Sequence, residues 1–174
     1  MKFTKVKING PKIIELDLLN DSRGFFARQF CQEEFKKNGL NSAILQINTS
    51  FCRKKGTLRG LHFQPEPYGE VKFLRCISGE IVDFLVDVRK DSPTYLDSFS
   101  IVLSSKNRVA IYIPEGFAHG YMSLTNNAEV MYSSSQQYLP GVEKGIRWND
   151  PSIKLDLPFE PINVSEKDLS HPNI

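Results

Sequence analysis

The side chains best suited to chemistry gather in the stretch Arg59–Gln64, which holds an arginine, a histidine and a glutamine, with Lys72 a short distance beyond. Charged and imidazole groups alternate there with apolar residues, the pattern of a strand with one polar and one buried face. We interpret the polar face as the wall of a pocket for an anionic, ketone-bearing ligand. His62 is the expected base of that pocket.

The residue types in and around this stretch fit proton transfer beside a carbonyl group. A histidine acts as a general base near neutral pH when a carboxylate orients its ring. A lysine or arginine stabilises the charge that develops on a carbonyl oxygen, and a tyrosine, Tyr132 or Tyr138, can return a proton from the opposite side. Arg23, Arg59 and Lys72 suit a diphosphate, because guanidinium forks match phosphate oxygens. Each residue alone is more often structural than functional, so the prediction depends on their co-occurrence.

The three histidines, His62, His119 and His171, raise the question of a metal. Small metal-binding barrels commonly carry His-x-His on one strand, but the residue two positions after His62 is Gln64. His171 lies close to the C-terminus and is expected to be disordered or exposed. The spacing therefore argues against a metal site.

Short strands separated by turn residues dominate the chain from residue 43 onward, which favours a β-sandwich, jelly roll or closed barrel. The predicted strands are Ala43–Ser50, Gly56–Phe63, Val71–Ile77, Ile81–Val88, Ser98–Leu103, Val109–Ile113, Gly120–Leu124 and Glu129–Ser134. Two further strands are expected around the turn Asn9-Gly10-Pro11, and another over Phe25–Phe30. The convincing helix is Gln32–Gly39, acidic at its start and basic at its end.

Two of these strands carry further candidate site residues. In Ile81–Val88, Asp83 and Asp87 share a face with large aliphatic residues, which suggests a half-buried cavity wall; a merely wetted outer face is the alternative. The turn Pro114-Glu115-Gly116 is expected to deliver His119 to a strand end with little steric cover, where a ligand can approach.

The composition describes one soluble domain spanning residues 1–174, with 40% hydrophobic and 24% charged residues. The net charge of +2 gives no reason to expect nucleic-acid binding. The three cysteines have no CxxC spacing and fit free thiols in a reducing cytoplasm. No signal peptide or membrane span is apparent. The irregular Pro151–Pro172 segment is expected to pack across the sheet.

The chain resembles the dTDP-4-dehydrorhamnose 3,5-epimerase family of sugar-nucleotide epimerases, which are metal-free members of the cupin superfamily. The motifs that carry the resemblance cover nearly the whole chain in order. They are Asp21–Phe26, Gln46–Ser50, Leu58–Gln64, Lys72, Val86–Arg89 with Ser92–Thr94, Ile113–Gly120, Tyr132, Tyr138, Trp148–Pro151 and Ser165–Asp168.

The resemblance implies an all-β, cupin-type jelly roll with one or two short helices, forming a homodimer and acting on a nucleotide-diphosphate 4-keto-6-deoxy sugar without a cofactor. By similarity His62 is the base, Asp168 orients it, Lys72 stabilises the enolate and Tyr132 is the acid. The resemblance also implies substrate contacts, with Asp83 as the partner of His119 and Tyr138 stacking on the base. These contacts are Arg23, Arg59, Gln46, Asn48, His119, Tyr138, Glu143 and Lys167.

Arg28 departs from the family pattern, which has a glutamate there at the nucleotide end of the site. An arginine can bond bidentately to the O6/N7 edge of guanine, so the nucleotide is left open among dTDP, GDP and CDP. The alternative is that Arg28 contacts a phosphate or turns outward. Glu70, where glutamine is common, is expected not to touch the chemistry.

Other functions stay open beside a 3,5-epimerase. A relative that inverts only C3 or only C5 needs the same base and acid. A 4-keto-sugar 3,4-ketoisomerase also uses a cupin scaffold, but the motifs fit it less well. Outside enzymes, the alternative is an inactive sugar-binding barrel.

Overall fold

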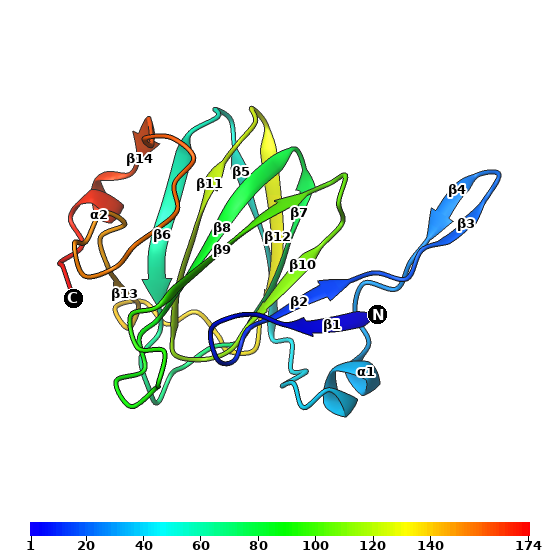
Figure 1. Ribbon diagram of the computed structural model, residues 1–174, viewed down its shortest axis with the longest axis horizontal. Coiled ribbons are helices and arrows are strands. Elements are labelled where there is room, and N and C mark those ends of the chain that lie inside the picture. The colour runs from blue at the N-terminus through cyan, green and yellow to red at the C-terminus, as the bar shows by residue number, and fades with distance from the viewer.

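The computed structural model describes residues 1–174 as a sandwich of two antiparallel sheets with a jelly-roll arrangement, which confirms the predicted fold class (Figure 1). The first sheet has the order β1-β2-β10-β7-β12-β5, and the second the order β13-β6-β11-β8-β9, with the short β14 parallel to β6. The strands of the first sheet are β1 (Lys2–Lys5), β2 (Lys12–Glu15), β10 (Ala110–Ile113), β7 (Lys72–Ser78), β12 (Ala128–Ser134) and β5 (Gln46–Cys52). Those of the second are β13 (Lys144–Gly145), β6 (Thr57–Phe63), β11 (Phe117–Ser123), β8 (Glu80–Asp87), β9 (Ser98–Ser104) and β14 (Asn163–Val164).

The space between the two sheets holds the largest apolar cluster, which includes Leu74, Ile81, Leu85, Ile111 and Val130. These residues alternate along their strands with residues that face the other way, as a half-buried strand requires. Because one sheet supplies β8 and β11 and the other supplies β7 and β12, polar residues on the same inward faces meet inside the sandwich. That meeting creates the site described below.

The outer face of the second sheet is covered by the chain that follows β12. Ile153 is buried there, and Leu155, Leu157 and Phe159 pack against the same cluster. The prediction that the proline-rich segment packs across a sheet is therefore confirmed. This segment includes helix α2 (Glu166–Leu169), which Figure 1 shows beside β6.

Helix α1 (Gln32–Lys37) covers part of the first sheet and confirms the predicted helix. Phe35 is its buried residue, with edge-on contacts to Phe3 and Phe73. Gly39, just past the helix, has a φ of +70°, a backbone conformation that glycine adopts without strain. None of the helices is both long and apolar enough to cross a membrane.

The hairpin formed by β3 (Leu19–Asp21) and β4 (Gly24–Phe26) projects away from the sandwich (Figure 1). The strand predicted over Phe25–Phe30 was wrong beyond Phe26, because the chain leaves the hairpin there and turns toward α1. Phe26 is 67% exposed and Leu19 is 65% exposed. The hairpin therefore has no hydrophobic cover within one chain.

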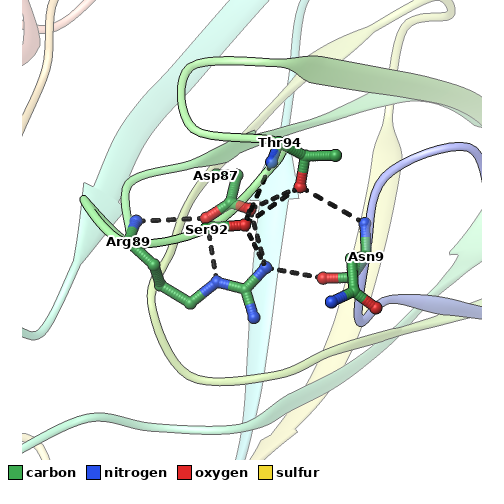
Figure 2. Close-up of polar contacts among 5 residues, drawn as sticks. All are labelled: Asn9, Asp87, Arg89, Ser92 and Thr94. Atoms are coloured by element: carbon green, nitrogen blue, oxygen red, sulfur yellow. Dashed lines mark hydrogen bonds and ion pairs between the residues drawn. The ribbon is translucent and has the colours of Figure 1, made fainter.

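The prediction of a half-buried wall with two aligned carboxylates was wrong. Both Asp83 and Asp87 have no exposed surface. Neither carboxylate lines the cavity of the functional site, and only Asp83 contacts one of its lining residues, His119. Figure 2 shows Asp87 in a separate network. Arg89 Nε and Nη2 donate hydrogen bonds to its two carboxylate oxygens at 2.8 and 2.6 Å. Ser92 and Thr94 donate further hydrogen bonds from their hydroxyl groups.

The Asp87 network joins the N-terminal segment to the loop after β8. Arg89 also donates to the carbonyl oxygen of Asn9 at 2.6 Å (Figure 2). Burial opposes ionisation of Asp87, but its hydrogen bonds from Arg89, Ser92 and Thr94 outweigh burial and lower its pKa to about 2. The network is thus a charged structural link that holds two distant segments together.

Candidate active site

A histidine–carboxylate dyad forms the centre of the site. His62 Nε2 lies 2.7 Å from Asp168 Oδ1, and the backbone N–H of Gly60 donates to Asp168 Oδ2 at 3.2 Å. Helix α2 delivers Asp168, and the Ser165 side chain caps that helix by accepting a hydrogen bond from the Asp168 N–H. Burial opposes ionisation of Asp168, but the hydrogen bonds from His62 and Gly60 lower its pKa. Asp168 is therefore an anion suited to orienting the imidazole.

Two glycines let the strands that carry the histidines approach closely. A Cβ at Gly60 would lie 2.6 Å from the Gly120 Cα, and a Cβ at Gly120 would lie 2.6 Å from the Arg59 carbonyl oxygen. Side chains are therefore excluded at this crossing of β6 and β11. The register pairs His62 directly with His119, which brings both imidazoles to the same region of the sheet.

His119 forms a second, deeper histidine–carboxylate pair. Its Nε2 lies 2.8 Å from Asp83 Oδ2, and burial raises the pKa of Asp83 although His119 opposes that effect. The expectation that His119 has little cover at a strand end was wrong. The strand β11 begins at Phe117 rather than Gly120, so His119 lies within the strand and is only 8% exposed.

Lys72 and Tyr132 reach the same site from the opposite sheet. Lys72 Nζ lies 2.9 Å from Glu70 Oε1, and Ser134 Oγ donates to Glu70 Oε2 at 2.6 Å. Burial raises the pKa of Tyr132, and the negative charge of Glu70 raises it further. The expectation that Glu70 stands apart from the chemistry was wrong. Glu70 lies in the loop just before β7, and its carboxylate bonds directly to Lys72, the first residue of that strand.

These groups line one cavity of about 340 Å³ between the sheets. Eleven of the predicted site residues are among its lining residues: Gln46, Asn48, Arg59, His62, Lys72, His119, Tyr132, Tyr138, Glu143, Lys167 and Asp168. Sequence reasoning missed Glu70 and Tyr121. Tyr121 follows His119 by two residues on β11 and donates to Ser50 Oγ at 2.7 Å, so the alternation of side chains along that strand would have found it.

The cavity mouth carries polar residues that are more exposed. Lys167 pairs with Glu143, and the ion pair raises the pKa of Lys167. Tyr138 is 55% exposed, and its backbone N–H donates to Gln46 Oε1 at 2.7 Å. An exposed aromatic ring beside cationic groups is suited to stacking on a planar ring of a bound anion.

Arg23 and Arg28 do not line this cavity within one chain. Arg23 lies in the projecting hairpin, where its guanidinium pairs with Asp21 at 2.6 Å and its side chain is 88% exposed. Arg28 points to helix α1 and lies 3.3 Å from Glu34. The predicted set of substrate contacts is therefore split between the cavity and the hairpin region.

His171 is not disordered or exposed, contrary to expectation. Its side chain is 11% exposed, and its Nε2 lies 3.5 Å from Asp168 Oδ1. The ring is edge-on to His62 with centroids 5.3 Å apart, and it occupies the space where Gly145 lacks a side chain. The backbone on either side is fixed, because the Pro172 carbonyl oxygen accepts from the Arg147 N–H at 3.1 Å and the Ile174 N–H donates to Asp150 at 2.6 Å.

Comparison with known proteins shows which family the chain resembles over almost its whole length. The model of the dTDP-4-dehydrorhamnose 3,5-epimerase family matches residues 5–174. A curated relative of that name from Methanothermobacter thermautotrophicus is 43% identical over 171 residues, covering 96% of this chain and 91% of the relative.

Two solved structures extend the comparison to bound ligands. The dTDP-4-dehydrorhamnose 3,5-epimerase of Bacillus anthracis with TDP and PPi bound has a TM-score of 0.96, 33% identity and 99% coverage of both chains. The dTDP-6-deoxy-D-glucose-3,5-epimerase of Legionella pneumophila, in complex with dTDP-4-keto-L-rhamnose, has a TM-score of 0.93 and 33% identity. It aligns over 99% of this chain and 92% of its own.

Proposed function

The chain belongs to the dTDP-4-dehydrorhamnose 3,5-epimerase family, and from this premise we propose that it inverts C3 and C5 of a dTDP-linked 4-keto-6-deoxy sugar. The observation that carries the proposal is the placement of opposed groups around one cavity. His62 enters from β6 in one sheet, and Lys72 and Tyr132 enter from β7 and β12 in the other.

The proposed base is His62, acting through Nδ1. Asp168 is an anion and accepts a hydrogen bond from His62 Nε2, so the neutral ring carries its proton on Nε2 and keeps the Nδ1 lone pair free. A ketone at C4 acidifies the hydrogens on C3 and C5, since the electron pair left by proton removal delocalises into an enolate. When Nδ1 takes the proton, the imidazolium is stabilised by the negative charge of Asp168.

Lys72 and Tyr132 complete the inversion. The Lys72 ammonium stabilises the enolate oxygen, and the raised pKa of Tyr132 keeps its phenol protonated until it donates to the carbon from the other side. The carbon then carries a proton on the opposite face, and His62 returns its proton to solvent while Tyr132 recovers one. The proposed chemistry needs no cofactor.

The remaining contacts suit the nucleotide diphosphate. Arg59 and Lys167 supply positive charge along the cavity, and Tyr138 offers a ring for the nucleobase. His119, Gln46, Asn48 and Glu143 supply further donors and acceptors to the sugar and nucleotide. The Bacillus anthracis relative with TDP and PPi and the Legionella pneumophila relative with a dTDP sugar favour thymine as the base.

We also propose that residues 1–174 act as one domain in a homodimer of the cytoplasm. Arg23 and Arg28 lie outside their own chain's cavity, so a partner is needed if they contact substrate. The exposed apolar residues of the projecting hairpin favour such a partner. Arg28 forms an ion pair with Glu34. A structural role or a phosphate contact is therefore better supported for Arg28 than recognition of guanine.

Deuterium incorporation tests the activity. We expect the protein, incubated in deuterated water with 4-keto-6-deoxy sugars on dTDP, GDP or CDP, to label C3 and C5 of the dTDP sugar. His62→Asn should abolish label at both carbons, since it removes the base while preserving a polar side chain of similar size. Mass spectrometry of the recovered sugar measures both results.

Each other outcome selects an alternative. Label at a single carbon identifies a single-centre epimerase, and label on the GDP or CDP sugar alone revives a role for Arg28 in base recognition. A ketone moved from C4 to C3 identifies a 3,4-ketoisomerase. No label on any sugar leaves an inactive sugar-binding barrel, and substantial exchange by His62→Asn removes His62 as the base.

A further inference from the structure

The third histidine, His171, places a ring nitrogen that the proposed mechanism does not use next to Asp168, the partner of the proposed base. His171 Nε2 is buried and has no hydrogen-bond partner in the protein. It lies 3.5 Å from Asp168 Oδ1, the same oxygen that accepts a hydrogen bond from His62. A buried imidazole nitrogen without a partner is costly, so it calls for a ligand.

Three ligand atoms converge at this point: His62 Nε2, Asp168 Oδ1 and His171 Nε2 all lie within 4.8 Å of one another. Zinc bound by histidine and aspartate in tetrahedral geometry separates such atoms by about 3.4 Å, given metal–ligand distances of about 2.1 Å. The distance from His171 to Asp168 already matches. The distance from His62 to Asp168, 2.7 Å, must open by roughly 0.7 Å to admit the ion.

We propose that His62, Asp168 and His171 form an inhibitory site for Zn²⁺, with water as the fourth ligand. The donor set favours this class of cation, because two imidazoles and one carboxylate suit zinc whereas magnesium prefers oxygen ligands throughout. The position of His171 is fixed, since Gly145 leaves room for its ring and the hydrogen bonds of Arg147 and Asp150 hold the backbone on either side.

The inhibitory effect rests on the proposed function of His62 as base. Zinc binds the Nε2 lone pair of neutral His62, so the single N–H proton of the ring moves from Nε2 to Nδ1. The Nδ1 lone pair that would accept the substrate proton is thereby occupied. The ion also neutralises Asp168, which would otherwise stabilise the imidazolium. Binding therefore stops proton abstraction without blocking the cavity.

Zinc binding and epimerase activity are measured separately on the full chain. Isothermal titration with ZnCl₂ should give one site per chain with micromolar affinity, and the same zinc range should inhibit the epimerase, reversed by EDTA. His171→Phe keeps a planar ring beside Gly145 and removes the ligand atom. It should retain basal activity and bind zinc roughly 100-fold more weakly, as lost support of a ligand already costs 10- to 100-fold.

Two controls isolate the site. Cys31→Ser removes the one cysteine that is not fully buried and should leave zinc binding unchanged. MgCl₂ should neither bind nor inhibit at the same concentrations. Equal zinc affinity in wild type and His171→Phe, or no zinc binding by wild type, overturns the proposal.

The activity assay separates failure of the zinc site from failure of the proposed function. Zinc binding that depends on His171 in a protein without epimerase activity supports the site and removes its inhibitory role. Epimerase activity without zinc binding leaves the proposed function intact and the zinc site refuted.

Discussion

Glu70 illustrates how one residue tunes the proposed acid. Its carboxylate bonds Lys72 and Ser134 inside the cavity, and its charge adds to burial in raising the pKa of Tyr132. Glu70→Gln keeps an acceptor of the same shape and removes the charge. The pKa of Tyr132 should fall, so the tyrosine loses its proton at lower pH.

The alkaline limb of kcat/KM should therefore move to lower pH in Glu70→Gln, while kcat near neutral pH changes by less than about tenfold because the acid is still in place. The pH–rate profile measures this shift. Glu15→Gln breaks a Lys2–Glu15 pair of similar length, 2.8 Å, on the exposed surface and is the matched control. A limb that stays in place or moves upward would show that Glu70 does not act on Tyr132.

At this scale the sequence predicted most cavity residues and misjudged others for identifiable reasons. Motif and alternation were sufficient for His62, Lys72 and Tyr132, because a strand's period fixes which side chains share a face. The burial of His171 was not predicted, because a residue near a chain end is usually exposed. Its burial depends on a long-range contact with Gly145, whose missing side chain leaves room for the ring. No local pattern contains that information.

At the scale of elements, the Asp87 network joins the loop after β8 to the segment between β1 and β2, and it should be sensitive to acid. Its pKa of about 2 lies below the ordinary value of 3.8. The stability it contributes is therefore fully present above about pH 4 and is lost as the pH falls toward 2. Urea unfolding at pH 7 and pH 3 measures the loss.

Asp87→Asn should lower the free energy of unfolding at pH 7 by about 2 kcal/mol, since it removes the charged acceptor of the Arg89, Ser92 and Thr94 hydrogen bonds while solvent still reaches part of Arg89. The variant should also lose part of the acid sensitivity. Asp21→Asn removes an exposed partner of Arg23 and should cost much less stability than Asp87→Asn, because solvent screens an exposed pair. Equal losses in the two variants would mean that the Asp87 network is no stronger than a surface ion pair.

Strand boundaries were predictable where turn residues mark them, as at Ser78-Gly79, and less so where pairing decides them. Strand β11 starts at Phe117 because Phe117 and Ala118 pair with Asp87 and Val86 of β8. The turn Pro114–Gly116 signals only that a strand follows, not how far back its pairing extends. Likewise, the residues Asp21–Gly24 favour a turn, but no local pattern indicates that the hairpin around them lacks hydrophobic cover.

At the scale of the whole molecule, the hairpin and strand β5 expose apolar side chains that no other part of the chain covers. Strand β5 is an edge strand, with Ile47 65% exposed, and Phe26 of the hairpin is 67% exposed. Exposed edges and apolar patches of this kind mark association sites. Phe26→Asp should convert the proposed dimer into a monomer in analytical ultracentrifugation. Ile162→Asp, at a residue 73% exposed elsewhere, should leave the dimer intact.

A shared site makes a stronger prediction than association alone. If Arg23 serves the partner's cavity, His62→Asn and Arg23→Ala chains are each weak alone, but a mixed dimer contains one cavity with both native residues. Random pairing makes half of the dimers mixed, so refolding the two together should recover about a quarter of wild-type activity. If Arg23 instead served its own chain, every cavity would lack one residue and mixing would recover nothing. Epimerase assays before and after mixing distinguish the two arrangements.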